Sequence, residues 1–181
     1  MKYAQTKSGL LVPVGYGTEG FRLGGRFKAS LYRKGVLIDE WESKNLAVNQ
    51  GLNDALNAYF NAGGQTTTWY MGIYQGNYVP VATDTAATIA GNSTECSSYS
   101  SATRPQWQQA APSGQSITNA ANRATYTFTG GVTVYGAFLI SSSVIGGTAG
   151  VLFAAAQFGA SKAVVTSDQL LLTYTINALP S

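Results

Sequence analysis

The alternation of hydrophobic and polar residues predicts a chain made mostly of β-strands. In residues 124–129, Ala124, Tyr126 and Phe128 alternate with three threonines. Successive side chains of a strand point to opposite faces, so this spacing gives the strand one hydrophobic face. Strands are predicted over residues 26–33, 36–42, 65–74, 124–129, 132–141, 150–158 and 169–178.

The same alternation predicts which side chains face the core. Residues 26–33 and 36–42 form a predicted hairpin that turns at Lys34-Gly35. The expected inward residues of the hairpin are Phe27, Ala29, Leu31, Val36, Ile38 and Trp41. In the three later strands they are Thr67, Trp69, Met71 and Ile73; Val132, Val134, Phe138 and Ile140; and Leu170, Leu172, Tyr174 and Ile176.

One segment has helical spacing. Its hydrophobic residues recur three and four positions apart, at Leu52, Ala55, Leu56, Tyr59 and Phe60. The pattern predicts a helix over residues 50–61 that closes one end or edge of a sheet. Asn49 is the expected cap at its start, and the glycine pair 63–64 is expected to stop the chain just after its end.

Two segments lack a regular pattern. Residues 1–25 contain six glycines and Pro13, and they are predicted to form an extended N-terminal arm. The apolar stretch LLVPV in this arm is expected to dock on the chain's own domain or on a neighbouring subunit. Residues 75–123 are rich in Ser, Thr, Asn and Gln and are predicted to be mostly loop.

These segments together predict an all-β protein with one short helix. About seven strands without crossover helices favour an antiparallel β-sandwich or a jelly roll over an α/β sheet. Residues 26–181 are therefore expected to form a single domain, preceded by the arm at residues 1–25.

Charge is distributed unevenly along the chain. Residues 1–44 hold eight of the eleven basic residues and four of the eight acidic ones, a net charge of +4, whereas the whole chain carries +3. This distribution favours an acidic partner for the N-terminal segment, although an ordinary solvated hairpin is an equally good interpretation.

The composition argues against an enzyme. The chain has no histidine and one cysteine, and its eight acidic residues are scattered. Asp39 and Glu40 are expected on opposite faces of a strand, with Glu40 and Glu42 on one face beside basic neighbours. Cys96 is interpreted as a bystander thiol, because the chain has no histidine to activate it.

Other ligands and partners find little support in the sequence. A structural calcium site at Asp84, Asn92 and Glu95 stays open, but these residues lack D-x-D spacing, and we expect neither metal nor cofactor. The glycine pairs do not lie in phosphate-binding motifs, and the basic residues lack the clustering with aromatics expected for nucleic-acid binding. No signal peptide or window of about 20 apolar residues indicates a membrane partner.

Interaction surfaces are therefore the expected functional sites. Trp107 lies in a polar segment beside Arg104, where a cation–π contact at an interface is expected. The arm and the basic strand supply the other candidates. The full set of predicted interface residues is Leu10, Leu11, Val12, Tyr16, Arg22, Arg26, Lys28, Arg104 and Trp107.

A series of spaced segments resembles a family of small structural proteins of tailed bacteriophages. The segments are WESKNLAVNQGLNDALNAYF, TTTWYMGIYQGNY, DTAATIAGNSTECSSYSSATRPQW, SITNAANRATYTF, GAFLISSS, GGTAGVLFAAAQF and DQLLLTYTI. The resemblance covers roughly residues 26–178 and contains no catalytic motif.

The resemblance implies a virion protein, in particular a decoration (cement) protein assembled in the host cytoplasm and bound outside the capsid. Its expected partners are the major capsid protein and further copies of itself, as a dimer or trimer. A tail or fibre component and a host-glycan-binding module are the alternatives.

Overall fold

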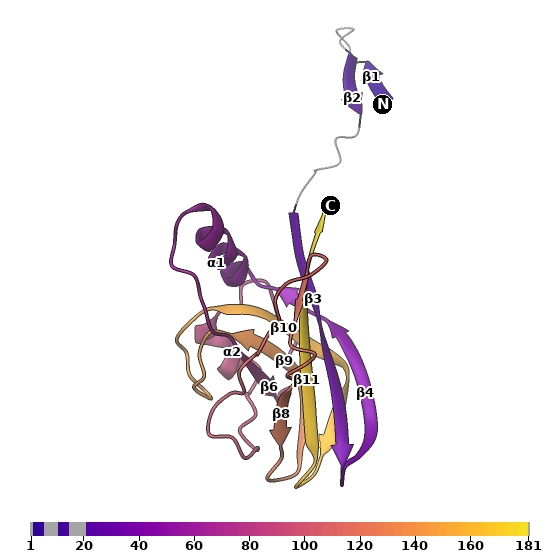
Figure 1. The fold of residues 1–181 in the computed structure, drawn as a ribbon, viewed down its shortest axis with the longest axis vertical. Helices are drawn as coiled ribbons and strands as arrows, with labels where there is room; N and C mark the ends of the chain where they lie inside the picture. Colours follow the sequence, from indigo (N-terminus) through magenta and orange to yellow (C-terminus); the bar gives the residue numbers. More distant parts are fainter. Residues whose placement is uncertain (1, 6–10, 15–20, 181) are drawn as a thin grey trace.

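The fold is an antiparallel β-sandwich, as seen in a computed structural model that describes residues 2–5, 11–14 and 21–180 (Figure 1). The strands are β1 (Lys2–Gln5), β2 (Leu11–Val14), β3 (Phe21–Arg33), β4 (Val36–Lys44), β5 (Leu46–Ala47), β6 (Tyr70–Tyr74), β7 (Ser116–Thr118), β8 (Ala124–Thr127), β9 (Val132–Ile140), β10 (Leu152–Val164) and β11 (Gln169–Pro180). The helices are α1 (Asn49–Phe60) and α2 (Ala86–Asn92). The sandwich prediction is confirmed.

The first sheet has the order β4-β3-β11-β7, with β8 also paired to β11. Its central ladder joins β3 to β11 from Tyr32–Gln169 to Phe21–Pro180. The predicted hairpin is confirmed, and its turn places Lys34 and Gly35 at φ 51° and 78°. Glycine adopts positive φ without the steric cost that a side chain adds, which explains its position in this turn.

The predicted inward face of β4 was wrong for the start of the strand. Asp39 pairs with Leu31 but Leu37 pairs with Tyr32, so β4 carries one extra residue at Ile38. Val36, Leu37 and Ile38, at and before this bulge, are all exposed. Trp41 does face inward, as predicted, where it packs against the core.

The second sheet has the order β5-β10-β9-β6 and is covered on both faces. Residues 137–140 of β9 and 152–156 of β10 are buried without alternation. The predicted common face of β9 was therefore wrong. Val134 faces the other sheet, whereas Phe138 and Ile140 face away from it, and the phase changes near Gly136, where β10 has an irregular register.

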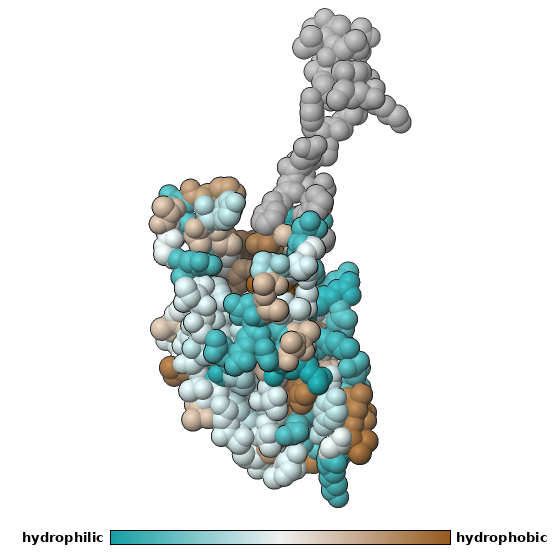
Figure 2. All heavy atoms as spheres, in the orientation of Figure 1, coloured by the Kyte–Doolittle hydropathy of each residue, from teal (hydrophilic) through white to brown (hydrophobic). Residues whose placement is uncertain are grey.

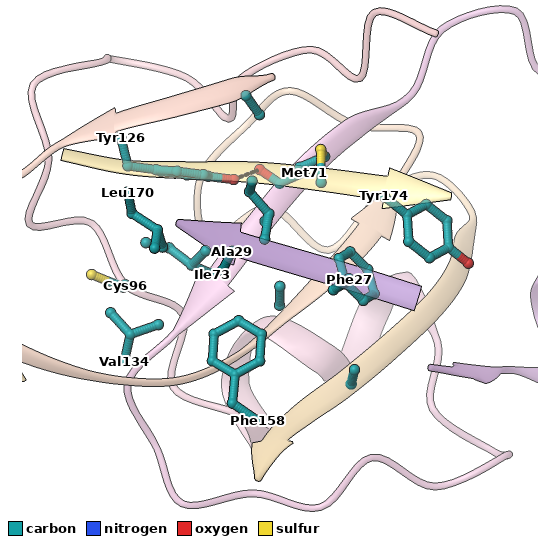
Figure 3. Packing of buried hydrophobic residues seen from close by; sticks show 14 of the residues in the cluster. Phe27, Ala29, Met71, Ile73, Cys96, Tyr126, Val134, Phe158, Leu170 and Tyr174 are labelled. Carbon is teal, nitrogen blue, oxygen red and sulfur yellow. Dashed lines mark hydrogen bonds between the residues drawn. The ribbon is translucent and has the colours of Figure 1, made fainter. Parts of the chain in front are cut away.

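The main core lies between the two sheets (Figure 3). Phe27 of β3 stacks on Tyr174 of β11 with ring centroids 4.3 Å apart. Tyr126 is fully buried, and its hydroxyl donates a 2.6 Å hydrogen bond to the carbonyl of Met71 in the opposite sheet. The predicted inward residues Tyr126, Phe128, Leu170 and Leu172 are confirmed as buried, whereas Ile176 is partly buried against the core.

A smaller core covers the outer face of the second sheet. Ala86 and Ile89 of α2 pack there with Phe138, Ile140 and other buried residues. This short helix lies in the segment expected to be mostly loop, and it begins with a capping box between Thr85 and Thr88.

Only the start of α1 packs on the sandwich. A side chain on Gly51 would come within 2.5 Å of the Phe153 backbone, so the glycine lets the first turn lie directly on β10. The later turns leave Leu56, Tyr59 and Phe60 exposed, so the helix closes the sheet edge only at its beginning. Asn49 is the first helical residue; the cap position is Val48, and no side chain caps the helix start.

The N-terminal boundary also differs from the prediction. Strand β3 begins at Phe21, so residues 21–25 belong to the main sheet and not to an irregular arm. Strands β1 and β2 form a separate two-stranded antiparallel sheet, which is drawn beyond the end of the sandwich in Figure 1. Leu10 and Tyr16 lie outside the described residues, whereas the backbones of Leu11 and Val12 belong to β2.

Candidate binding surfaces

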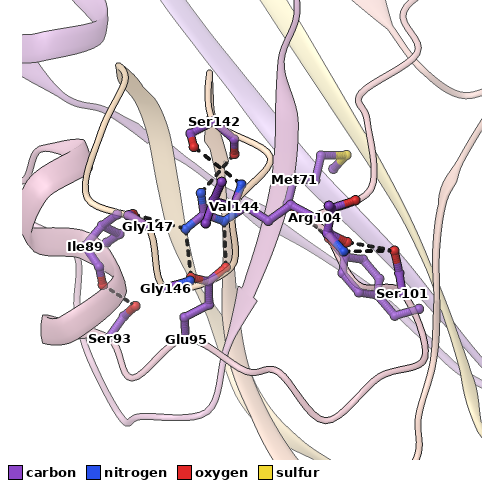
Figure 4. A network of polar contacts seen from close by, with 12 residues as sticks. Met71, Ile89, Ser93, Glu95, Ser101, Arg104, Ser142, Val144, Gly146 and Gly147 are labelled. Carbon is purple, nitrogen blue, oxygen red and sulfur yellow. Dashed lines mark hydrogen bonds and ion pairs between the residues drawn. The ribbon is translucent and has the colours of Figure 1, made fainter.

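Arg104 was predicted at an interface but is buried in an ion pair. Its guanidinium donates to both carboxylate oxygens of Glu95, at 2.7 and 2.8 Å, and to the carbonyl of Ser142 at 2.9 Å (Figure 4). Glu95 also accepts a hydrogen bond from the amide of Gly146. The pair therefore ties the segment around residues 93–107 to the loop between β9 and β10, and the prediction of an exposed Arg104 was wrong.

Trp107 is also buried, and it contributes to the main core. Its indole nitrogen donates a 3.0 Å hydrogen bond to the carbonyl of Tyr174, and only 3% of the residue is exposed. The predicted cation–π contact is replaced by a different one, because the Arg104 guanidinium lies 5.3 Å from the centre of the Phe138 ring. A polar sequence around one tryptophan was a poor guide to its exposure, because Trp107 is buried while its neighbours Gln106 and Gln108 are exposed.

The three residues weighed for calcium do not share one site. Asp84 is buried and accepts hydrogen bonds from the Tyr78 hydroxyl, the Val81 amide and the Asn92 side chain. Glu95 is engaged by Arg104 instead. Within the described residues, no three acidic or thiol groups come together to hold a metal ion.

The buried thiol and phenols are held in their neutral forms. Burial raises the pKa of the Cys96 thiol, and it raises the pKa of Tyr126 and Tyr174 well above the usual range for phenols. These groups lie in the core between the sheets, so their chemistry is that of packing and internal hydrogen bonding.

The outer face of the first sheet is a shallow charged groove. Arg26 pairs with Glu42 at 2.8 Å and Lys28 pairs with Glu40 at 3.0 Å. This arrangement confirms that Glu40 and Glu42 share a face beside basic neighbours. The groove has a volume of about 510 Å³ and also includes Ser30, Thr118, Ala120, Arg123, Thr173, Thr175 and Asn177.

Local hydrogen bonds set the charge state of Glu40 in this groove. The hydrogen bond from Lys28, followed by that from Ser30, lowers the pKa of the Glu40 carboxyl.

The predicted interface residues Arg26 and Lys28 are exposed but already paired with acidic residues, and Arg22 is exposed. Their contact with a partner stays a prediction.

An apolar groove runs along α1. It has a volume of about 770 Å³ and is lined by Leu23, Leu52, Ala55, Leu56, Tyr59 and Phe60. Figure 2 shows hydrophobic residues on α1 and beside it, next to the start of β3. Tyr59 and Phe60 are 83% and 74% exposed. We call this feature the α1 groove.

A second apolar surface lies at the opposite end of the sandwich. The bulged start of β4 exposes Val36, Leu37 and Ile38, which we call the hairpin tip (Figure 2). Beside it, Arg33 donates two hydrogen bonds to Asp168, at 2.9 and 2.8 Å. This ion pair joins the hairpin to the turn before β11 and so fixes the position of the hairpin tip.

Comparison with known proteins adds no family. A scan against models of protein families finds none that matches the chain, and a search of curated proteins also finds no match. Within the residues that the structure describes, neither helix is long and apolar enough to cross a membrane.

Sequence reasoning missed both apolar surfaces for identifiable reasons. The helical spacing of α1 was recognised, but its apolar face was assigned to the core when only the first turn packs there. The signal for the hairpin tip was three consecutive apolar residues, Val36 to Ile38, which strict alternation cannot place on one face.

Proposed function

We propose that this chain is a structural protein of a tailed-bacteriophage virion, bound to the outside of the capsid as a decoration protein that stabilises the head. The proposal takes its class from the resemblance across residues 26–178. The proposed partners are the major capsid protein and further copies of the chain.

The hairpin tip is the observation that carries the proposal. Val36 is 64% exposed, although β-branched residues of this kind are usually buried in a sandwich. Contiguous apolar surface on a folded domain often marks a contact with another protein. The tip also belongs to the basic segment 1–44, which suits a partner with acidic surface.

The proposed mechanism is stabilisation by linkage. A protein that binds the mature shell and not its precursor lowers the free energy of the mature state, by an amount that grows with the logarithm of its free concentration relative to its dissociation constant. Contacts from many copies then act together over the particle. A two-sheet body with ion pairs at its edges suits this role, because Lys162 of β10 joins Asp39 of β4 at 2.8 Å.

Copy number is the decisive test of this proposal. Quantitative mass spectrometry of purified particles should give hundreds of copies, in fixed proportion to the major capsid protein. A dozen or fewer would instead favour the tail or fibre alternative, and absence from the particle would end the virion proposal.

Shell contact through the tip is tested by a matched pair of variants. Val36 and Val79 are both 64% exposed, but Val79 lies in a loop outside the tip. We expect Val36→Asp to weaken co-sedimentation with undecorated capsids by about tenfold or more and Val79→Asp to leave it within about twofold. Equal binding of the two variants would remove the tip from the proposal.

A glycan-binding module is the second candidate, and the charged groove is what favours it. Its threonines, Asn177 and paired charges supply hydrogen-bond donors and acceptors over about 510 Å³. A glycan array gives the test. Binding that is lost on Thr173→Val and Asn177→Leu would favour this candidate.

A further inference from the structure

The α1 groove has the features of a site for a peptide segment. Its described lining is uncharged and includes two aromatic rings, and Tyr59 and Phe60 pack edge to face with centroids 4.8 Å apart. The volume of about 770 Å³ lies in the range of clefts that hold small ligands or a few side chains. We propose that the groove binds the apolar segment 10–14 (LLVPV) of a second copy of this chain.

The segment has the matching chemistry. Residues 10–14 are five consecutive apolar residues, whereas Lys7 and Glu19 are the nearest charged residues on either side. Its described part, β2, pairs with β1 in a sheet that is separate from both sheets of the sandwich. A two-stranded hairpin alone is only marginally stable in water, so docking on a hydrophobic surface would stabilise it.

The direction of β3 favours a second copy over the chain's own groove. The ladder with β11 continues past Leu23 of the groove to Phe21, opposite Pro180, and so carries the chain out of the end of the sandwich. Figure 1 draws the β1–β2 hairpin beyond that end and away from α1. At this end a second copy can meet the segment.

The length of the connection is sufficient. Leu23 lies nine positions after Val14, and an extended chain of nine residue steps spans about 30 Å. Helix α1 has 12 residues and is therefore about 18 Å long. The segment can thus reach the groove of an adjacent molecule.

An exchange of segments in both directions also makes the contact area large enough for a stable dimer. Stable interfaces bury about 800 Å² on each partner, which one short helix face does not supply alone. Two copies that each donate a segment and each offer a groove make the contact twice, as twofold symmetry requires. This inference does not rest on the proposed virion function.

Sedimentation velocity of the full-length protein is the first test. Leu56 of the groove and Leu37 of the hairpin tip are matched leucines, 53% and 47% exposed. We expect wild-type dimers, a self-association constant weakened about tenfold or more by Leu56→Glu, and a change within about twofold for Leu37→Glu. A monomeric wild type, or equal effects of the two variants, would overturn the inference.

Photo-crosslinking identifies the occupant of the groove. Isotope-labelled and unlabelled protein carrying Tyr59→benzoylphenylalanine are mixed, equilibrated, irradiated and digested with trypsin. Crosslinks between labelled and unlabelled chains at the tryptic peptide 8–22 are expected. Crosslinks to that peptide within one chain would show self-docking, and crosslinks to α1 of a second copy would show helix pairing; either would contradict the proposal.

The two tests also separate this inference from the proposed function. Loss of dimers in Leu56→Glu together with absence from virions would support the segment exchange and reject the capsid role. The reverse pattern would reject the exchange and leave the capsid role in place.

Discussion

The sheet β4-β3-β11 packs one face on the core and leaves the other as a charged groove, whereas the sheet β5-β10-β9-β6 is covered on both faces. The first sheet accordingly alternates, as in β8, where Ala124 and Tyr126 are buried and Thr125 is exposed. The second contains runs of consecutive buried residues, such as 137–140. Alternating burial along a strand therefore indicates a sheet with one face in solvent, and consecutive buried residues indicate a sheet that is covered on both faces.

Ion pairs differ between the two regions in the same way. Arg26 and Glu42 on the first sheet have side chains 54% and 44% exposed, whereas Arg104 and Glu95, near the second sheet, are 0% and 3% exposed. Water screens the first pair and is excluded from the second. The four substitutions below test whether this contrast in burial sets their energetic effects.

The largest expected effect comes from Phe138→Ala in the outer layer of the second sheet. Phe138 is fully buried, and its ring occupies the space that a side chain on Gly72 would need. We expect a loss of about 4 kcal/mol in the free energy of unfolding, measured with urea. Thr125→Ala, exposed on the first sheet, is the control and should stay within about 0.5 kcal/mol. Similar losses for both would contradict the two-layer description.

Glu95→Gln is expected to cost about 3 kcal/mol, because it leaves the buried Arg104 charge without its counter-ion. The glutamine keeps one oxygen that can accept the hydrogen bond from the Gly146 amide. The loss of stability should therefore lie near the lower end of the range for buried ion pairs that lose one partner. Adding Arg104→Met should recover part of the stability, as a double-mutant cycle would measure. An additive result would show that the pair is not coupled.

Acid should weaken the contact that anchors the hairpin tip. Hydrogen bonds from Arg33 lower the pKa of Asp168 below its usual value of 3.8. The folded state therefore favours the ionised carboxylate, and its contribution is complete above about pH 5 and disappears as the pH falls below about 4. In urea unfolding across this range, the stability difference between wild type and Asp168→Asn should shrink as the pH falls. A constant difference would contradict this assignment.

Glu42→Gln on the first sheet should have the smallest effect. Its ion pair with Arg26 is exposed, so we expect a change of about 0.5 kcal/mol or less, further reduced by salt. The measurement is the same urea titration at low and high ionic strength. A loss as large as that of Glu95→Gln would break the contrast between the two regions.

Several features were determined by the sequence alone. The alternating strands β3, β8 and β11, the turn at Lys34-Gly35 and the position of α1 follow from local periodicity and backbone preference. These signals need no knowledge of distant residues, because each strand or helix carries its own pattern of faces. The antiparallel sandwich followed from them.

Only the tertiary structure decided which surfaces are covered. Arg104 is buried together with its ion-pair partner Glu95. Trp107 is buried where its indole nitrogen donates a hydrogen bond to Tyr174, which is distant in the sequence. The α1 face and the hairpin tip are exposed because α1 contacts β10 only at its start and because β4 is bulged. Burial of a side chain depends on what packs over it, and that neighbour is set by the three-dimensional arrangement of the whole chain.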